Sequence, residues 1–165
     1  MKTRPLAVPH HRPPARPEEF VAEAERMTNE RDVDGIRTVF APTATWSSTI
    51  DGMVVSARGI DEIHARWDLM CRFMQARGLT VHKTLVTSDD DTIVNEWTGS
   101  LGGSTAARGI EVWTFDRDGL VSDQRLYGFL NTRSDRSVLQ SLRMLAAYPL
   151  TAVTFARLRT QWRRA

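Results

Sequence analysis

The spacing of hydrophobic residues changes near residue 78 and separates a mainly helical part of the chain from a β-rich part. Before this point, apolar residues recur every three or four positions in three segments, as on one face of a helix. After it, apolar and β-branched residues alternate with polar ones. We expect helices over 17–29, 33–40 and 61–77, and strands over 44–50, 53–57, 79–87, 92–101 and the two halves of 107–128.

Prolines and glycines indicate where these elements end. Pro42 is expected to stop the second helix, because proline has no amide hydrogen to continue it. Asp51-Gly52 and Asp118-Gly119 are expected to form turns between strands, and Gly78 to end the long helix. Helices followed by a meandering antiparallel sheet predict the α+β class.

The charge of the chain is unevenly distributed. Its 165 residues have the length of one domain, and residues 1–17 and 149–165 each carry four basic residues and no acid. The segment between them has 14 basic and 20 acidic residues, a net charge of −6. A nucleic-acid-binding protein carries its positive charge on the folded body, so no nucleic-acid partner is expected.

Three parts are expected from this composition: a disordered, basic, Pro-rich tail over 1–17, a folded domain over 18–132 and a C-terminal amphipathic helical extension over 133–165. So short an apolar stripe usually packs on its own protein or on a second subunit; contact with a membrane surface is the alternative. There is one cysteine, Cys71, and no segment has the pattern of a secretory signal or a membrane span, so a cytoplasmic protein is expected.

Glu111 is the first candidate for function. It is the one ionisable residue between Ile110 and Phe115, in what the pattern predicts to be a buried strand. A carboxyl group enclosed by apolar side chains can donate or accept a proton near neutral pH. The alternative is a structural role, in which Glu111 pairs with Arg108 or Arg125 across the sheet or faces solvent.

Strand alternation places further side chains on the same face as Glu111. If this face is concave, it lines a pocket of large aromatic and a few polar groups, as small-molecule sites often are. The pocket residues predicted from the strands are Trp46, Ser48, Asn95, Trp97, Trp113, Gln124 and Leu126, and Trp67 joins them from the apolar face of the long helix.

His82 is the second catalytic candidate. It lies in the middle of the predicted strand 79–87, and an imidazole can exchange protons near neutral pH. With Glu111 it would form an acid–base pair if both side chains point inward. The neighbouring Lys83 indicates that one face of this strand is wet, and parity alone does not say which.

No metal or cofactor is expected. The chain has no His-x-x-x-His or Cys-x-x-Cys pair, and Asp89-Asp90-Asp91 is typical of a solvated turn. Gly102-Gly103 follows a strand but does not lead into a helix, so it is not a phosphate-binding loop.

The order of these elements, together with several short motifs, resembles the nuclear transport factor 2-like superfamily, and within it the SnoaL-like polyketide cyclases and ketosteroid isomerases. The similarity covers about residues 18 to 131. The resemblance implies a cone-shaped curved sheet, antiparallel or mixed, wrapped around a long helix, with an apolar pocket inside and frequently a dimer. The motifs are the run from Val33 to Ala44 followed by Thr-Trp, Arg58-Gly59-Ile60, Glu96-Trp97-Thr98-Gly99, Gly109-Ile110-Glu111-Val112-Trp113 and Asp118-Gly119.

The resemblance also bears on single residues. Glu111 stands where ketosteroid isomerases have a protonated Asp that donates to the developing enolate. Ser48 stands at the position of their general-base Asp and Ala24 at that of their oxyanion-hole Tyr, so steroid isomerisation itself is not implied. The positions of the acid–base pair of SnoaL-like cyclases hold the Gly102-Gly103 bend and Gln124 or Leu126.

Two functions from different classes follow. The first is an enzyme that works without a cofactor on a hydrophobic, polyketide- or terpenoid-like molecule, using Glu111 and His82 or a water in a cyclisation, isomerisation, dehydration or epoxide opening. The second is a ligand-binding or dimerising module that has the pocket but not the chemistry.

Overall fold

The computed structural model describes residues 16–102, 104–132 and 138–162. These residues form two compact units, divided between Asn131 and Thr132. The first 15 residues of the predicted tail and residues 133–137 of the predicted extension lie outside the described residues. The first helix begins at Pro17, as the sequence predicts.

The first unit contains three helices and six strands, in the order that the hydrophobic pattern predicts. The elements are α1 (Pro17–Glu30), α2 (Ile36–Val39), β1 (Phe40–Ile50), β2 (Met53–Arg58), α3 (Ile60–Arg77), β3 (Thr80–Ser88), β4 (Thr92–Leu101), β5 (Ser104–Phe115) and β6 (Val121–Phe129).

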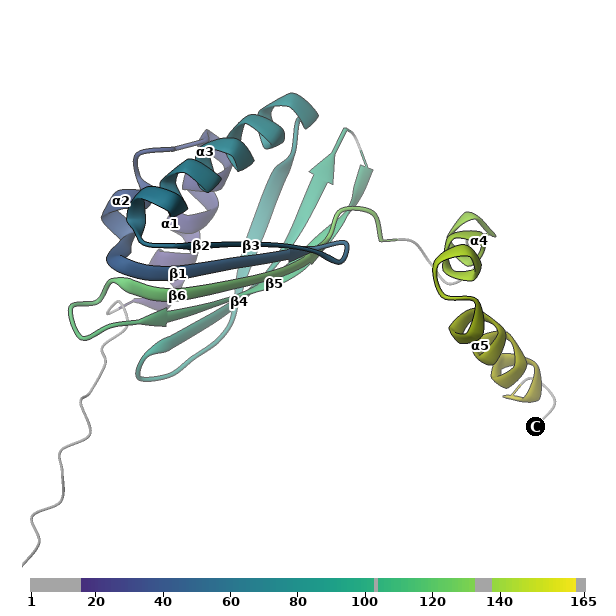
Figure 1. The fold of residues 1–165 in the computed structure, drawn as a ribbon. Helices are drawn as coiled ribbons and strands as arrows, with labels where there is room; N and C mark the ends of the chain where they lie inside the picture. The colour runs from purple at the N-terminus through teal and green to yellow at the C-terminus, as the bar shows by residue number, and fades with distance from the viewer. Residues whose placement is uncertain (1–15, 103, 133–137, 163–165) are drawn as a thin grey trace, which may run out of the picture. The chain divides into compact units, whose positions relative to one another are not determined.

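The six strands form one curved sheet in the order β2-β1-β6-β5-β4-β3 (Figure 1). Neighbouring strands are antiparallel except β1 and β6, which run parallel. The sheet is therefore mixed, and this confirms the predicted α+β class and the mixed curved sheet.

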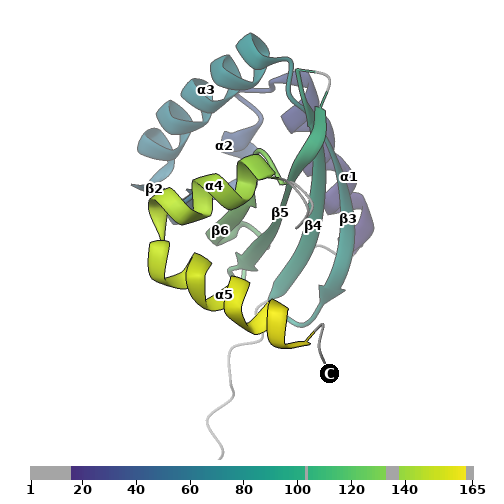
Figure 2. The ribbon, with the colours of Figure 1, turned by 90° about the vertical axis from the view of Figure 1, so that its right-hand side faces the viewer.

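The three helices lie on one side of this sheet (Figure 1). In Figure 2, α1 runs beside β3, with which it is in contact, and α3 contacts β1 and β2. The side chains that face the helices are buried: along β5, Glu111, Trp113 and Phe115 are buried, whereas Ile110 is exposed. The alternation predicted for β5 is thus confirmed, and the buried face is the concave one.

The predicted turns and helix ends are confirmed at Asp51-Gly52 and Gly78. Asp51 and Gly52 both have positive φ, 49° and 84°, which suits the two-residue hairpin that joins Ile50 to Met53. Gly78 caps α3 with φ 58°. The prediction for Pro42 is wrong: α2 ends before it and β1 already begins at Phe40. A register shift between Phe40 and Thr45 accommodates the proline, which cannot donate a ladder hydrogen bond.

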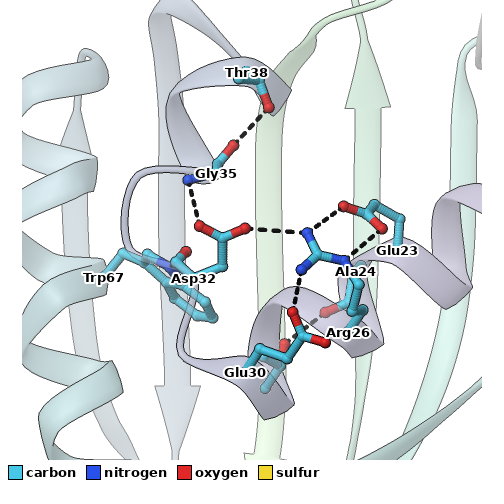
Figure 3. Close-up of polar contacts among 9 residues, drawn as sticks. Glu23, Ala24, Arg26, Glu30, Asp32, Gly35, Thr38 and Trp67 are labelled. Atoms are coloured by element: carbon cyan, nitrogen blue, oxygen red, sulfur yellow. Dashed lines mark hydrogen bonds and ion pairs between the residues drawn. The ribbon is translucent and has the colours of Figure 1, made fainter.

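A charged network around Arg26 ties the helices together (Figure 3). The Arg26 guanidinium donates to Glu23 and Glu30 on α1 and to Asp32 in the loop before α2, at 3.0 Å. The Asp32 carboxylate also accepts a hydrogen bond from the Gly35 N–H at 2.9 Å. The backbone carbonyl of Asp32 accepts one from Trp67 Nε1 on α3, also at 2.9 Å. The network therefore links α1, α2 and α3.

The second unit contains α4 (Val138–Ala147) and α5 (Pro149–Trp162), which contact each other. Both helices were expected from the apolar spacing of the extension. Several of their apolar side chains are exposed: Val138, Leu142, Leu145, Leu150 and Val153. Of the helices described, none is long and apolar enough to span a bilayer.

Candidate functional site

A cavity of about 100 Å³ lies within the first unit, between the concave face of the sheet and the helices. Most of its wall is apolar. Four of the five tryptophans of the sequence line it. The lining residues from the sheet are Phe40, Trp46, Ile50, Val81, Lys83, Trp97, Glu111, Trp113, Gln124 and Leu126, and those from α1 to α3 include Phe20, Ala24, Met27, Trp67, Met70, Phe73 and Met74.

Glu111 is in this wall and forms a buried ion pair with Lys83. Lys83 Nζ lies 3.0 Å from Glu111 Oε1 and 2.8 Å from Oε2, and each side chain is only 4% exposed. Lys83 is on β3 and Glu111 on β5, with β4 between them. The long lysine stem reaches across the intervening strand, so that both charged groups meet at the cavity.

Two further side chains extend this pair into a chain of hydrogen bonds. Asn95 Nδ2 donates to Glu111 Oε2 at 3.0 Å, and Trp113 Nε1 donates to Asn95 Oδ1 at 2.7 Å. The register explains the first contact, because Asn95 and Glu111 are cross-strand partners on β4 and β5. The Asn95 amide is thereby oriented, with its NH₂ group toward Glu111 and its oxygen toward Trp113.

The pair makes the two charges tolerable inside an apolar cavity. An isolated buried charge costs several kcal/mol even after relaxation, and partner charges and hydrogen bonds offset this cost. Lys83 Nζ also lies 5.5 Å from the centroid of the Trp113 ring, a distance at which the ring attracts a cation. A carboxylate and an ammonium group thus line one small cavity with no net charge between them.

The structure does not bring His82 to Glu111. The His82 side chain is 74% exposed and its Nδ1 lies 3.1 Å from Glu25 Oε2 on α1. Lys83 is the inward residue of this part of β3, so the expectation that Lys83 marks a wet face is wrong. The charged partner of Glu111 is therefore Lys83 and not His82. Neither Arg108 nor Arg125 pairs with Glu111, because Arg125 contacts Asp123 and Arg108 is exposed.

One signal in the sequence points to Lys83. Of the 22 basic residues, 20 are arginine and two are lysine, at positions 2 and 83. Lys83 is therefore the single lysine of the described residues, but strand parity could not say that it points inward.

Of the eight predicted pocket residues, six line the cavity: Trp46, Trp67, Trp97, Trp113, Gln124 and Leu126. Asn95 and Ser48 are buried, at 0% and 3% exposure, but are not among the lining residues. Asn95 instead lies behind the wall, where it holds Glu111 and Trp113.

Trp97 Nε1 is a buried polar atom of the cavity wall that has no hydrogen-bond partner among the described residues. Gln124 is a further polar group of this wall. It lies on β6 between Trp46 and Trp113, its cross-strand partners on β1 and β5, and is 4% exposed. Within the part of the chain that the structure describes, its carboxamide forms no hydrogen bond. Buried amides are normally paired, so Gln124 offers a donor and an acceptor to a molecule in the cavity.

Two glycines make room for Trp97 in the wall. A Cβ atom at Gly109 would lie 2.6 Å from the Trp97 indole and 2.2 Å from the Tyr127 carbonyl oxygen. A Cβ at Gly128 would lie 2.6 Å from the same ring. The indole therefore lies directly on the backbone of β5 and β6, and the absence of side chains at these two positions shapes this end of the cavity.

Metal binding has no support in the described residues, where no three His, Cys, Asp or Glu side chains gather into a possible site. The lone thiol is buried: Cys71 on α3 is 3% exposed, and burial raises its pKa to about 11. His64, also on α3, lies on the surface, 3.2 Å from Asp34.

Comparison with solved structures supports the same fold. The chain is similar to the epoxide hydrolase/cyclase-like enzyme SalBIII of pyran ring formation in salinomycin (19% identity over 69% of this chain and 91% of that chain, TM-score 0.53). It is also similar to a SnoaL-like protein of unknown function from Burkholderia thailandensis (20% identity over 68% of this chain and 92% of that chain, TM-score 0.56). A third similar structure is a steroid delta-isomerase from Pseudomonas aeruginosa (22% identity over 82% of this chain and 96% of that chain, TM-score 0.53). At these identities the likeness shows the fold alone.

A search of curated proteins gave no match. The SnoaL-like domain family, by contrast, matches residues 19–124, which run from the first turn of α1 to the first residues of β6 and include every polar residue of the site described above. The match covers more than half of the chain, and the curved mixed sheet agrees with it. The chain belongs to the SnoaL-like domain family.

Proposed function

We propose that the protein is a small-molecule enzyme of the SnoaL-like type that moves protons on a hydrophobic substrate without a cofactor. One observation carries this proposal: a Lys83–Glu111 pair, 4% exposed on each side, in the wall of an apolar cavity. Side chains that exchange protons act best when they are positioned beside the reacting group and shielded from water.

The two charged groups have complementary roles. The Glu111 carboxylate takes a proton from a carbon or hydroxyl of the substrate, and the Lys83 ammonium group stabilises the oxyanion that develops nearby. Asn95 holds the carboxylate in place through its 3.0 Å hydrogen bond, and Gln124 binds a polar substituent of the substrate. An isomerisation, cyclisation, dehydration or epoxide opening requires these steps in different orders.

The size of the cavity limits the part of the substrate that enters it. Small-molecule sites usually enclose about 300–1,000 Å³, whereas this cavity has about 100 Å³. A polyketide- or terpenoid-like molecule would therefore insert one compact apolar end. The side chain of Phe73, which lines the cavity and is 41% exposed, is then in place to contact the remainder.

A ligand-binding module is the second candidate, and one observation favours it. Both Glu111 oxygens already accept hydrogen bonds, from Lys83 and Asn95, so the carboxylate is satisfied without a substrate. In that case the pair would serve to recognise a dipolar ligand, and bound molecules would leave unchanged.

A substrate panel in D₂O separates the two functions. Small ketones, enones and epoxides with apolar substituents are incubated with the protein, and NMR follows deuterium uptake and the loss of the double bond or epoxide ring. The variant Lys83→Met/Glu111→Gln, which keeps an uncharged cavity of similar volume, serves as the control. Binding of each compound to both proteins is measured by calorimetry.

The enzyme proposal predicts conversion or exchange by the wild type and none by the double variant, which still binds the apolar compounds. Binding by both proteins with no reaction of any panel compound would favour the module. Reaction at equal rates in both proteins would contradict a role for the pair.

A further inference from the structure

Lys83 places a primary amine, which an arginine could not supply, in the wall of the cavity. Arginine remains protonated in proteins, whereas a buried lysine can lose its proton and become a nucleophile. The chain carries arginine at 20 of its 22 basic positions, and Lys83 is the only lysine within the described ranges. This lysine lies in the wall of the cavity, beside the Glu111 carboxylate.

The neighbours of Lys83 supply what amine catalysis needs. Glu111 Oε2 lies 2.8 Å from Nζ and can take its proton directly. The remaining surroundings are apolar and aromatic, with the Trp113 ring centroid 5.5 Å away, so an imine formed at Nζ is shielded from water. The free Gln124 carboxamide offers a donor for a carbonyl oxygen in the same cavity.

We propose that Lys83 forms an imine with a small ketone or aldehyde, or with the carbonyl end of a larger molecule, bound in this cavity. The inference deepens the proposed function, on which it rests: it names the substrate class as carbonyl compounds and assigns Lys83 a covalent role. An iminium ion withdraws electrons from the neighbouring carbon, so that Glu111 could then remove a proton there.

Imine formation at Lys83 needs only the carbonyl compound, the Lys83 amine and the Glu111 carboxylate. Lys83 transfers a proton to Glu111, the neutral Nζ attacks the carbonyl carbon, and the oxygen takes the proton from Glu111. The resulting carbinolamine nitrogen gives Glu111 a second proton, which passes to the hydroxyl group as the C–O bond breaks and water leaves. The products are a protonated C=N bond on Lys83, one water and the original carboxylate. No oxidant or reductant is consumed.

Charge and volume favour the same chemistry. The pair Lys83–Glu111 has no net charge before reaction and none after it, since the iminium ion replaces the ammonium ion opposite the carboxylate. The buried site therefore never holds an uncompensated charge, which would be costly. A cavity of about 150 Å³ in another protein holds benzene, so about 100 Å³ admits acetone or butanone but not a fused ring system.

Reductive trapping tests the inference on the whole protein. The wild type is incubated with acetone or butanone and sodium cyanoborohydride, digested and mapped by mass spectrometry. With acetone, each trapped lysine gains the mass of one isopropyl group. Acetylacetone is a second probe that needs no reductant, because its adduct with a neutral amine absorbs in the near ultraviolet. Lys2 and the terminal amine report non-specific modification in the same sample.

The expected result is modification of Lys83 at least about tenfold faster than of Lys2, with one acetylacetone bound per chain. Lys83→Arg keeps the positive charge and removes the nucleophile, so the fast modification is lost, whereas Lys2→Arg leaves it unchanged. Glu111→Gln slows trapping at Lys83 without preventing it. Circular dichroism checks that each variant is folded.

Trapping of Lys83 no faster than of Lys2 in the wild type overturns the imine, whether or not any variant folds. The proposed function is judged separately by the substrate panel. If panel compounds still react in the wild type and not in Lys83→Met/Glu111→Gln, proton transfer stands without the covalent step. If neither trapping nor reaction occurs, both proposals fail.

Discussion

Lys83 Nζ lies 2.8 Å from Glu111 Oε2, although the two residues are on strands that are not neighbours and are separated by β4. A lysine is long enough to cross the intervening strand and meet the carboxylate on the concave face. The shorter Asn95 on β4 fills the space between and donates to the same oxygen, at 3.0 Å. Three adjacent strands thus contribute one polar cluster to an otherwise apolar wall.

Breaking this pair should destabilise the fold more than removing it. Lys83→Met or Glu111→Gln alone leaves a buried charge without its partner, and we expect each to lower the free energy of unfolding by about 3–5 kcal/mol. Lys83→Met/Glu111→Gln removes both charges and should lose less than either single variant. Chemical denaturation of the four proteins measures the cycle.

The exposed pair Arg125–Asp123, with N–O distance 3.1 Å, is the matched control. Because its side chains are 48% and 36% exposed, Arg125→Met should cost no more than about 1 kcal/mol. If the double variant at 83 and 111 is as unstable as the sum of the two singles, the pair is not a coupled buried unit.

Gly109→Ala should destabilise the sheet at the wall of the cavity. The new Cβ would meet the Tyr127 carbonyl oxygen at 2.2 Å and the Trp97 indole at 2.6 Å, and the backbone oxygen cannot rotate away. Overpacking of this kind costs about 1–3 kcal/mol and sometimes more. Thr98→Ala, an exposed position on β4, is the control; equal melting temperatures of the two variants would contradict the close packing of Trp97.

The network in Figure 3 predicts part of the acid sensitivity of the protein. The Gly35 backbone N–H, and next Arg26, hold the pKa of Asp32 below its usual value of 3.8. A group with a lowered pKa stabilises the fold above its unfolded pKa, and this contribution is lost as the pH falls through the folded value. The melting temperature of the wild type should therefore be higher than that of Asp32→Asn at pH 6, and this difference should disappear as the pH falls below 3.8. A gap independent of pH would contradict the assignment.

The outer face of the sheet predicts a homodimer. Ile110 and Tyr127 are cross-strand partners with 39% and 46% exposure, and Phe129 on the same face of β6 is 58% exposed. An apolar patch of this kind is typical of an interaction surface. We expect light scattering to give twice the mass of the chain and Tyr127→Arg to shift it toward the monomer. A wild-type monomer at high concentration would exclude this pairing.

Much of the fold follows from the sequence, because its signals are local. Helical spacing in three segments, β-branched and aromatic residues in the strand segments, the turn at Asp51-Gly52 and the helix end at Gly78 were enough to predict every strand and helix of the first unit to within a few residues. The start of β1 was missed because a proline is tolerated at a strand irregularity, which depends on the pairing with β6 and not on the proline itself.

The site was only partly predictable for the same reason. Glu111 and five of the pocket residues that line the cavity were found from strand parity on β1, β4, β5 and β6, helped by the aromatic residues that mark the buried side. The sixth, Trp67, was found from the apolar face of α3. On β3 the parity was ambiguous, since His82 and Lys83 are both polar. The partner of Lys83 lies two strands away, so only the three-dimensional arrangement shows that the lysine is the inward residue.

The turnover rate of Glu111→Gln tests the central claim most directly. The substituted amide keeps the shape of the side chain and can still accept from Asn95, but it cannot take up a proton. With the panel compound that the wild type converts fastest, kcat should fall by about 10²- to 10⁴-fold, the usual contribution of a general base. A folded Glu111→Gln protein whose kcat stays within a few-fold of the wild type would contradict the acid–base role of Glu111.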